Sequence, residues 1–271
     1  MDKGTVIGLV VGFGALLTAN YLEGGEFHSL LNLPAFLIVI GGTLGATLIS
    51  FPLERVLRLP KLIALTFFER STTEDELIEQ FVHLAGKARR EGLLSLEAEI
   101  ANIKDPFIQK GLQLVVDGID PEMIREILEN HIHAAAERHE HGYSMLEAMG
   151  GYAPTMGIIG TVMGLIHVLS SLEDPSKLGG AIAVAFIATL YGVWTANLMW
   201  LPLGARLKAK SRAERAFRGV ALEGILSVQA GDNPRIVREK LGALLPRHAR
   251  GEANAASPSA QQSPAVMTGE S

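Results

Sequence analysis

The sequence predicts an all-α integral membrane protein with four spanning helices and a helical cytoplasmic insert between spans two and three. Nearly half of the residues are hydrophobic (48%), and the mean hydropathy is +0.26. Each of four stretches without Asp, Glu, Lys or Arg reaches or approaches the roughly 20 residues that cross a bilayer: 4–22, 27–53, 148–172 and 178–205. No useful length of sequence alternates apolar and polar residues, so no β-sheet is expected.

The four stretches pair into two hairpins. The first predicted hairpin is 1–52, with spans at about 4–22 and 30–51. The second is 148–205, with spans at about 152–172 and 179–203. The first stretch lacks a basic leader and a small-residue cleavage site, so we expect it to stay in the protein as a span.

The basic residues orient these hairpins. Segment 23–26 contains no Lys or Arg, and the turn between spans three and four contains only Lys177. Basic residues instead follow spans two and four: Arg55, Arg58, Lys61, Arg206, Lys208, Lys210, Arg212 and Arg215. The positive-inside rule therefore predicts that the insert and both termini are cytoplasmic.

The insert, residues 53–147, is predicted to be helical. Thr73 and Glu76 have the spacing of a capping box, and Gly92 is expected to end the helix that they begin. Residues 206–250 are predicted to form cytoplasmic amphipathic helices, the first of them along or just below the inner leaflet. The tail, 251–271, is poor in large apolar residues and is predicted to be disordered.

Spans three and four both carry stripes of small residues. On span three the stripe is Gly157, Gly160 and Gly164; on span four it is Ala181, Ala185, Ala188, Gly192 and Ala196. Small residues let helices approach closely in lipid, where association depends on packing. We therefore expect these stripes to receive a partner helix.

The four spans contain no Asp, Glu, Lys or Arg, although ion transporters usually carry such a group within the membrane. Either the chain conducts no ion, or a partner supplies the carboxylate. The polar candidates are Thr161, Thr189, Thr195 and Asn197, with His167 toward the outer end of span three. A hydroxyl can accept a proton donor or bind a cation, but a threonine can also simply bond the carbonyl four residues back.

No catalytic or metal-binding pattern is present. His131 and His133 would point about 200° apart on a helix, and the chain has no HExxH, P-loop or GxGxxG motif. It also has no cysteine. We expect no enzymatic activity, no metal and no cofactor.

Two long motifs resemble a known family. GGYAPTMGIIGTVMGLIHVL at 150–169 and AVAFIATLYGVWTANLMWLPLGARL at 183–207 are similar to the A subunit of the bacterial flagellar motor stator, the MotA/PomA family. The resemblance covers about residues 1–245. It implies that five A subunits surround two peptidoglycan-anchored B subunits, each supplying the intramembrane Asp, and that ion flow turns the A ring against the rotor's switch protein.

The resemblance also implies residue roles. It places Pro154, Thr161, Ala188 and Thr189 on the ion pathway, facing the partner's Asp. It assigns coupling to Pro202 with Asn197, and rotor contact to Arg89, Arg90 and Glu97. A proton is favoured as the transported ion, because sodium-driven members tend to have two adjacent threonines where this chain has Ala188–Thr189. Sodium remains possible, since the rest of span four is similar to sodium-type sequences.

Two alternatives stay open. An ExbB/TolQ-type subunit, which energises envelope transport, also surrounds a helix with an Asp, but such proteins usually have three spans and an insert after the first. A non-conducting membrane scaffold would not need Thr189 and Asn197 beside the small-residue stripe.

Overall fold

The computed structural model describes residues 3–67, 73–170, 172–173 and 175–244. Within these ranges the chain is helical and has no β-strand, as predicted. Four of its helices are long and apolar enough to cross a membrane, at 4–22, 33–50, 121–170 and 178–229. The predicted disordered tail lies outside the described residues.

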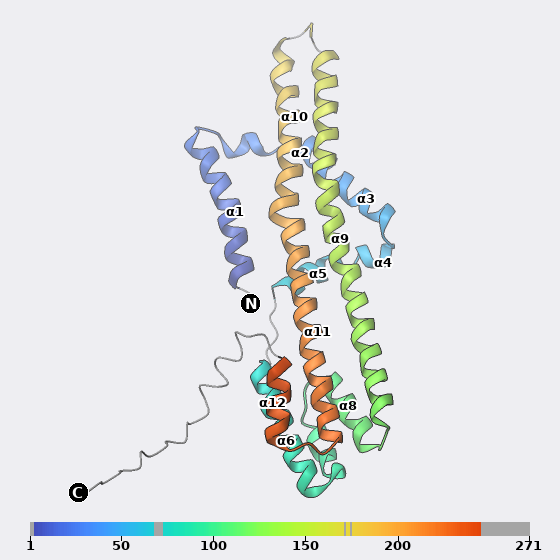
Figure 1. Cartoon of the computed structure of the whole chain (residues 1–271). Coiled ribbons are helices and arrows are strands. Elements are labelled where there is room, and N and C mark those ends of the chain that lie inside the picture. Colours follow the sequence, from blue (N-terminus) through green and yellow to red (C-terminus); the bar gives the residue numbers. More distant parts are fainter. Residues whose placement is uncertain (1–2, 68–72, 171, 174, 245–271) are drawn as a thin grey trace, which may run out of the picture. The chain divides into compact units, whose positions relative to one another are not determined.

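The chain divides into two compact units, and the first contains residues 1–70 and 133–215. Within this unit the upper parts of two long helices, α9 and α10, run side by side (Figure 1). The elements of the unit are α1 (Lys3–Leu22), the 3-10 turn η1 (Phe27–Leu30), α2 (Leu33–Phe36), the π-helical turn η2 (Leu37–Gly41), α3 (Gly42–Ser50), α4 (Leu53–Val56), α5 (Leu59–Thr66), most of α9 (Pro121–Ser170), α10 (Pro175–Thr195), the π-helical turn η4 (Ala196–Trp200) and the first half of α11 (Leu201–Gln229).

The second unit contains residues 71–132 and 216–271. Its described elements are α6 (Glu74–Glu91), the 3-10 turn η3 (Leu93–Leu96), α7 (Glu97–Ile100), α8 (Pro106–Val116), α12 (Pro234–Leu244) and the remaining parts of α9 and α11. The units do not coincide with the predicted segments: 53–70 and 133–147 of the predicted insert cluster with the spans. No helix break separates insert from span three, because α9 is continuous.

Local sequence signals set the ends of α6 as predicted. The Thr73 hydroxyl accepts a hydrogen bond from the Glu76 backbone N–H at 3.3 Å, and the Glu76 carboxylate accepts from the Thr73 N–H at 3.1 Å. This capping box satisfies two otherwise unpaired amides. At the other end Gly92 has φ +85°, a conformation that glycine adopts without strain and that ends the helix.

The core of the second unit corrects one expectation. The second half of α11 does not lie on a leaflet, because its apolar face is buried among the helices of this unit. Phe217, Ala221 and Ile225 belong to one buried cluster with Phe81 of α6 and Leu112 of α8. An amphipathic pattern indicates only that one face of a helix is buried, and here it is buried against other helices of the same chain.

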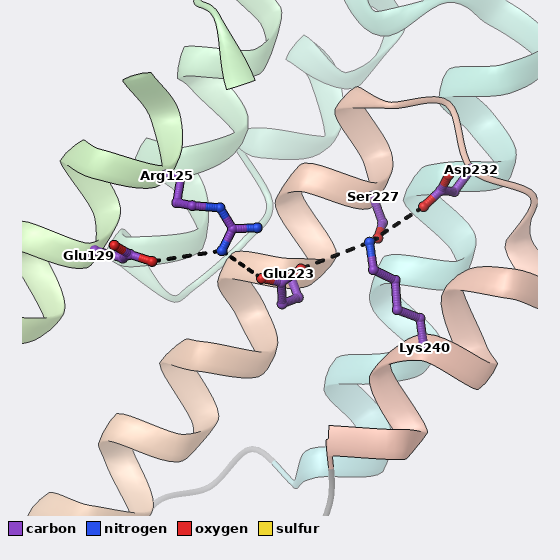
Figure 2. A network of polar contacts seen from close by, with 6 residues as sticks. All are labelled: Arg125, Glu129, Glu223, Ser227, Asp232 and Lys240. Atoms are coloured by element: carbon purple, nitrogen blue, oxygen red, sulfur yellow. Dashed lines mark hydrogen bonds and ion pairs between the residues drawn. The ribbon is translucent and has the colours of Figure 1, made fainter. Parts of the chain in front are cut away.

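A polar network joins three helices of this unit (Figure 2). Glu223 on α11 accepts a 2.8 Å hydrogen bond from Arg125 on α9 and lies 3.9 Å from the Lys240 amino group on α12. Lys240 also donates to Ser227 at 3.1 Å and lies 3.8 Å from Asp232. The Glu223 carboxylate raises the pKa of Arg125, mainly through this hydrogen bond. These pairs are partly exposed, so each is worth about 1 kcal/mol or less, and they specify helix register more than they add stability.

Candidate functional site

The two small-residue stripes pack against each other within one chain, which corrects the expectation that they receive a separate partner. A Cβ atom at Gly192 on α10 would lie 2.5 Å from the carbonyl oxygen of Ala153 and 3.1 Å from the Cα of Gly157, both on α9. A Cβ at Gly157 would lie 2.9 Å from the Ala188 carbonyl oxygen. Here α9 and α10 touch backbone to backbone, a contact that only glycine allows.

Ala188 is buried in this contact, so it does not face outward as predicted. Its side chain has 0% exposure and shares a small cluster with Ala35 and Val39 of span two. A Cβ at Gly160 would lie 2.5 Å from the Ala188 Cβ. Ala188 is therefore a packing residue within the chain, and it offers no surface to an ion or a partner's side chain.

Thr161 of α9 and Thr189 of α10 are brought together by the same hairpin. Their hydroxyl groups are in hydrogen-bonding contact with each other. The Thr161 oxygen also lies 3.1 Å from the carbonyl oxygens of both Gly157 and Ala185. One hydroxyl proton cannot serve three acceptors, so this cluster has spare lone pairs that can accept a hydrogen bond.

The threonine pair is a polar spot on an apolar face. Both side chains are half-buried, and residues three or four positions away share their helix face. On α9 these neighbours are Ile158 and Leu165, exposed by 58% and 48%; on α10 they are Phe186 and Val193, exposed by 70% and 47%. A hydrophobic helix that carries one proton donor would match this surface.

Two other polar residues of span four, Thr195 and Asn197, bond to carbonyls of their own helical segment. The Thr195 hydroxyl donates to the Tyr191 carbonyl at 2.7 Å, four residues back. The exposed Asn197 amide donates to the Val193 carbonyl at 2.8 Å. Thr195 therefore does what membrane threonines often do, which is to bond the carbonyl four residues back in the same helix. For Thr161 this is only one of several contacts.

The two prolines lie in different surroundings. Pro154 lies inside α9 without breaking it, and its Cα is 3.2 Å from a Cβ built at Gly192. Pro202 is exposed and lies two positions after the end of η4, the π-helical turn. It lines a pocket of about 340 Å³ with Leu198 and with Gly4 and Gly8 of α1. Proline cannot donate a backbone hydrogen bond, and π-helical turns often mark functional bends, so this is the point where span four can change direction.

Sequence analysis missed a tether formed by Tyr191. The phenol hydroxyl donates to the Leu30 carbonyl and accepts a hydrogen bond from the Asn32 N–H at 3.3 Å. Asn32 in turn caps α2, because its side chain accepts from the Ala35 N–H at 2.9 Å. The signal was the single phenol in the uncharged run of span four, two residues after Thr189. The tether holds the start of span two against span four.

The predicted rotor residues lie on both sides of one turn of the second unit. Arg89 and Arg90 lie in the last turn of α6, and Glu97 is the first residue of α7; all three are exposed. Lys87 of α6 donates a 2.7 Å hydrogen bond to Glu99 of α7 and so joins the two helices across this turn. The Lys87 amino group lowers the pKa of Glu99 below its ordinary value.

This lowered pKa predicts an acid-sensitive turn. A carboxylate whose folded pKa is depressed adds stability above its unfolded pKa and loses it as pH falls through the folded pKa. At pH 7 we expect the amides of α6 and α7 to exchange with solvent faster in Glu99→Gln than in the unchanged chain. The gap should close below about pH 4. Hydrogen exchange compared between the two chains at equal pH measures it, and an equal gap at both pH values would contradict the assignment.

Two histidines of α9 have side-chain partners within the protein. His131 lies 2.8 Å from the Lys110 amino group, and His139 lies 3.3 Å from the Ser211 hydroxyl. Across the described ranges, no three His, Cys, Asp or Glu side chains are grouped so that they could hold a metal ion.

Comparison with known proteins assigns the family. Residues 6–92 match the model for the motility protein A N-terminal region, and residues 99–218 match the MotA/TolQ/ExbB proton channel family. Motility protein A of Bacillus subtilis (strain 168) is 42% identical over 247 residues, which cover 91% of this chain and 92% of that protein. The chain belongs to the motility protein A family. Chemotaxis protein PomA of Vibrio alginolyticus is 35% identical, over 88% of this chain and 92% of its own length.

A solved structure with the same fold is a flagellar stator. The chain matches the flagellar MotAB stator complex from Bacillus subtilis with a TM-score of 0.86 and 40% identity, over 92% of this chain and 99% of the other. Within the motility protein A family, the proton-channel model covers Pro154, Thr161, Thr189 and Pro202. Arg89 and Arg90 lie in the N-terminal match, and Glu97 falls between the two matched ranges.

Proposed function

We propose that this chain is the A subunit of a flagellar motor stator, in which the Thr161–Thr189 pair faces the ion-carrying carboxyl group of a B subunit. One observation carries the proposal. Two hydroxyls from different spans meet on an exposed apolar face, in a protein whose spans contain no Asp, Glu, Lys or Arg. Family membership supports the same role, because motility protein A of Bacillus subtilis is a relative at 42% identity and the matching solved structure from that species is a flagellar stator complex.

The chemistry of the site requires a partner acid. A carboxylate in a membrane is costly, and a proton lowers that cost by neutralising it. The protonated carboxyl can donate to the spare lone pairs of the threonine pair while the B helix packs on the surrounding apolar side chains. The A subunit then supplies the acceptor for each protonation cycle, and the B subunit supplies the titrating group.

A proton remains the favoured ion, although the structure changes the reason why Ala188 matters. The methyl side chain of Ala188 has no oxygen to bind a cation, and it is buried against Gly160. The half-buried threonine pair then offers few oxygens to a sodium ion. Swimming speed of a stator-less flagellated strain that expresses this chain with its cognate B subunit tests the ion. Swimming that occurs without sodium and stops with a protonophore would support the proton as the transported ion. Swimming that appears only as the sodium concentration rises would show that the transported ion is sodium.

The assembly follows the family resemblance. Five copies of the chain surround two B subunits in the inner membrane, with both termini and the second unit in the cytoplasm. Stepwise rotation of the five-copy ring would push the second unit against the rotor's switch protein. The exposed turn with Arg89, Arg90 and Glu97 is the proposed contact, and Pro202 with Asn197 couples ion passage to movement. The protein acts without a cofactor and catalyses no covalent reaction.

Reversing one charge at this turn tests the rotor contact. We expect Arg89→Glu to lower torque several-fold, because an attractive exposed pair becomes repulsive. Ion uptake should be unchanged, since Arg89 is far along the sequence from both spans of the ion site. Torque of a tethered motor is the readout, and Lys104→Glu, also exposed in the second unit, is the matched control. If no charge reversal on the switch protein restores torque, direct pairing is wrong.

A further inference from the structure

Two short helices, α4 and α5, follow directly after span two and are held against the long helices of the first unit. Val56 and Leu59 are buried in a cluster with Met145 and Met149 of α9. The last carbonyls of α5, those of Leu65 and Thr66, accept hydrogen bonds from the Lys210 amino group at 3.0 and 2.7 Å. A cation at a helix C-terminus also interacts favourably with its dipole. One face of this segment is therefore held by protein.

The exposed surface of this segment combines leucines with cations. Leu53, Leu57 and Leu65 are exposed by 61%, 71% and 48%. We call the following six exposed side chains the α4–α5 patch: Leu53, Arg55, Leu57, Arg58, Lys61 and Leu65. None of its three cations has an ion pair or hydrogen bond with any residue that the structure describes. The only acidic side chain within this stretch is Glu54, which leaves a net positive charge.

The patch lies where a membrane surface is expected. Span two ends at Ser50, only three residues before α4 begins. In Figure 1, α4 and α5 lie level with the N-terminal end of α1 in the same unit, where the apolar stretch of that helix begins. Two independent spans therefore mark the same boundary between hydrocarbon and water.

We propose that the α4–α5 patch binds anionic phospholipid headgroups of the inner leaflet. The leucines enter the acyl boundary, and the long arginine and lysine side chains reach the phosphates. This combination is typical of interfacial helices, in which burial of apolar side chains and attraction to anionic lipid both contribute to binding. Arginine also matches phosphate oxygens with two parallel hydrogen bonds. The proposal depends on the membrane location of the spans and not on the ion pathway.

The lipid preference of the intact complex tests this site. The complex is purified with its B subunit and reconstituted in phosphatidylcholine vesicles. Electron paramagnetic resonance compares the association of spin-labelled phosphatidylglycerol and spin-labelled phosphatidylcholine. Each cation near an anionic surface contributes about a fivefold preference, and boundary lipid elsewhere dilutes it. We expect Arg55→Gln/Arg58→Gln/Lys61→Gln to lower the preference for phosphatidylglycerol at least about twofold.

Matched variants separate the patch from general charge. Lys104→Gln/Lys110→Gln/Arg235→Gln removes three exposed cations from the second unit and should leave the preference unchanged. Arg55→Lys/Arg58→Lys should retain it, which guards against a folding defect. In the unchanged protein, raising salt from about 0.1 to 1 M should abolish most of it, because the Debye length falls from about 10 to 3 Å.

Two results would overturn the proposal. One is an equal phosphatidylglycerol preference in the triple patch variant and the unchanged complex. The other is displacement of the lipid by millimolar inorganic phosphate, which would show a site for a soluble anion instead of a lipid surface.

Discussion

Replacing Thr189 by valine is expected to lower ion flux through the complex at least about tenfold. Valine keeps the shape of threonine but removes the hydroxyl that contacts Thr161. A protonated carboxyl on the partner helix would then face an apolar methyl group, and an unsatisfied polar group in such a site costs about 1–3 kcal/mol. Proton uptake by vesicles that contain the complex, under an imposed membrane potential, measures the loss.

The structure supplies a matched control in the same span. Thr195 lies in α10 as well, but its hydroxyl donates to carbonyls of its own helix, those of Tyr191 and Gly192. Thr195→Val should therefore leave flux within about twofold of the unchanged complex. Thr189→Ser should restore most of the flux because it restores the hydroxyl. Full flux in Thr189→Val would reduce the threonine pair to a helix-packing contact.

Replacing Gly192 by alanine is expected to disrupt the hairpin of spans three and four. The new methyl group would lie 2.5 Å from the Ala153 carbonyl oxygen and 3.1 Å from the Gly157 Cα. Neither backbone atom can rotate away, so the helices must separate and lose their packing along the whole stripe. Overpacking of a well-packed site costs about 1–3 kcal/mol, and movement of Thr189 relative to Thr161 should also stop rotation.

Gly151 provides the comparison for this second result. It lies in α9 near Ala153, but a Cβ there meets nothing within 4 Å. We expect Gly151→Ala to match the unchanged chain in thermal stability in detergent, and Gly192→Ala to unfold several degrees lower and to recover poorly as a complex. Equal stability of the two variants would show that the helices can separate at little cost.

Both expectations follow from the same packing of α9 against α10. The backbone contact at Gly157 and Gly192 sets the distance between α9 and α10, and that distance places the two threonine hydroxyls in contact. The Tyr191 tether then holds the adjacent start of span two. A polar site in a membrane needs such rigid support, because lipid offers no hydrogen bonds to a displaced hydroxyl.

Much of the fold could be predicted from local patterns. Stretches without charges predicted the spans, and the capping box at Thr73 and the glycine at Gly92 predicted the ends of α6. These signals act over a few residues or through composition, so they need no knowledge of distant neighbours. The candidate threonines could also be named in advance, since they are unusual groups in apolar helices.

What covers a surface could not be predicted in the same way. The small stripes were expected to meet another chain, and they meet each other; Ala188 was expected to face outward, and it is buried. The first part of 206–250 was expected at the leaflet, but α11 continues into a helical core. A small residue indicates only that something packs closely against it, and an apolar residue indicates only that water is excluded. Neither indicates whether the neighbour is the same chain, another chain or lipid.

The sequence by itself therefore determined the number of apolar spans, the ends of α6 and the lack of Asp and Glu within those spans. The orientation of the spans stays a prediction from the basic residues. Only the tertiary structure decided that Thr161 and Thr189 share a hydrogen bond, that Thr195 does not join them, and that Tyr191 holds span two. The physical reason is range. Periodicity and capping act along one helix, whereas a contact between residues 28 positions apart depends on how two helices pack.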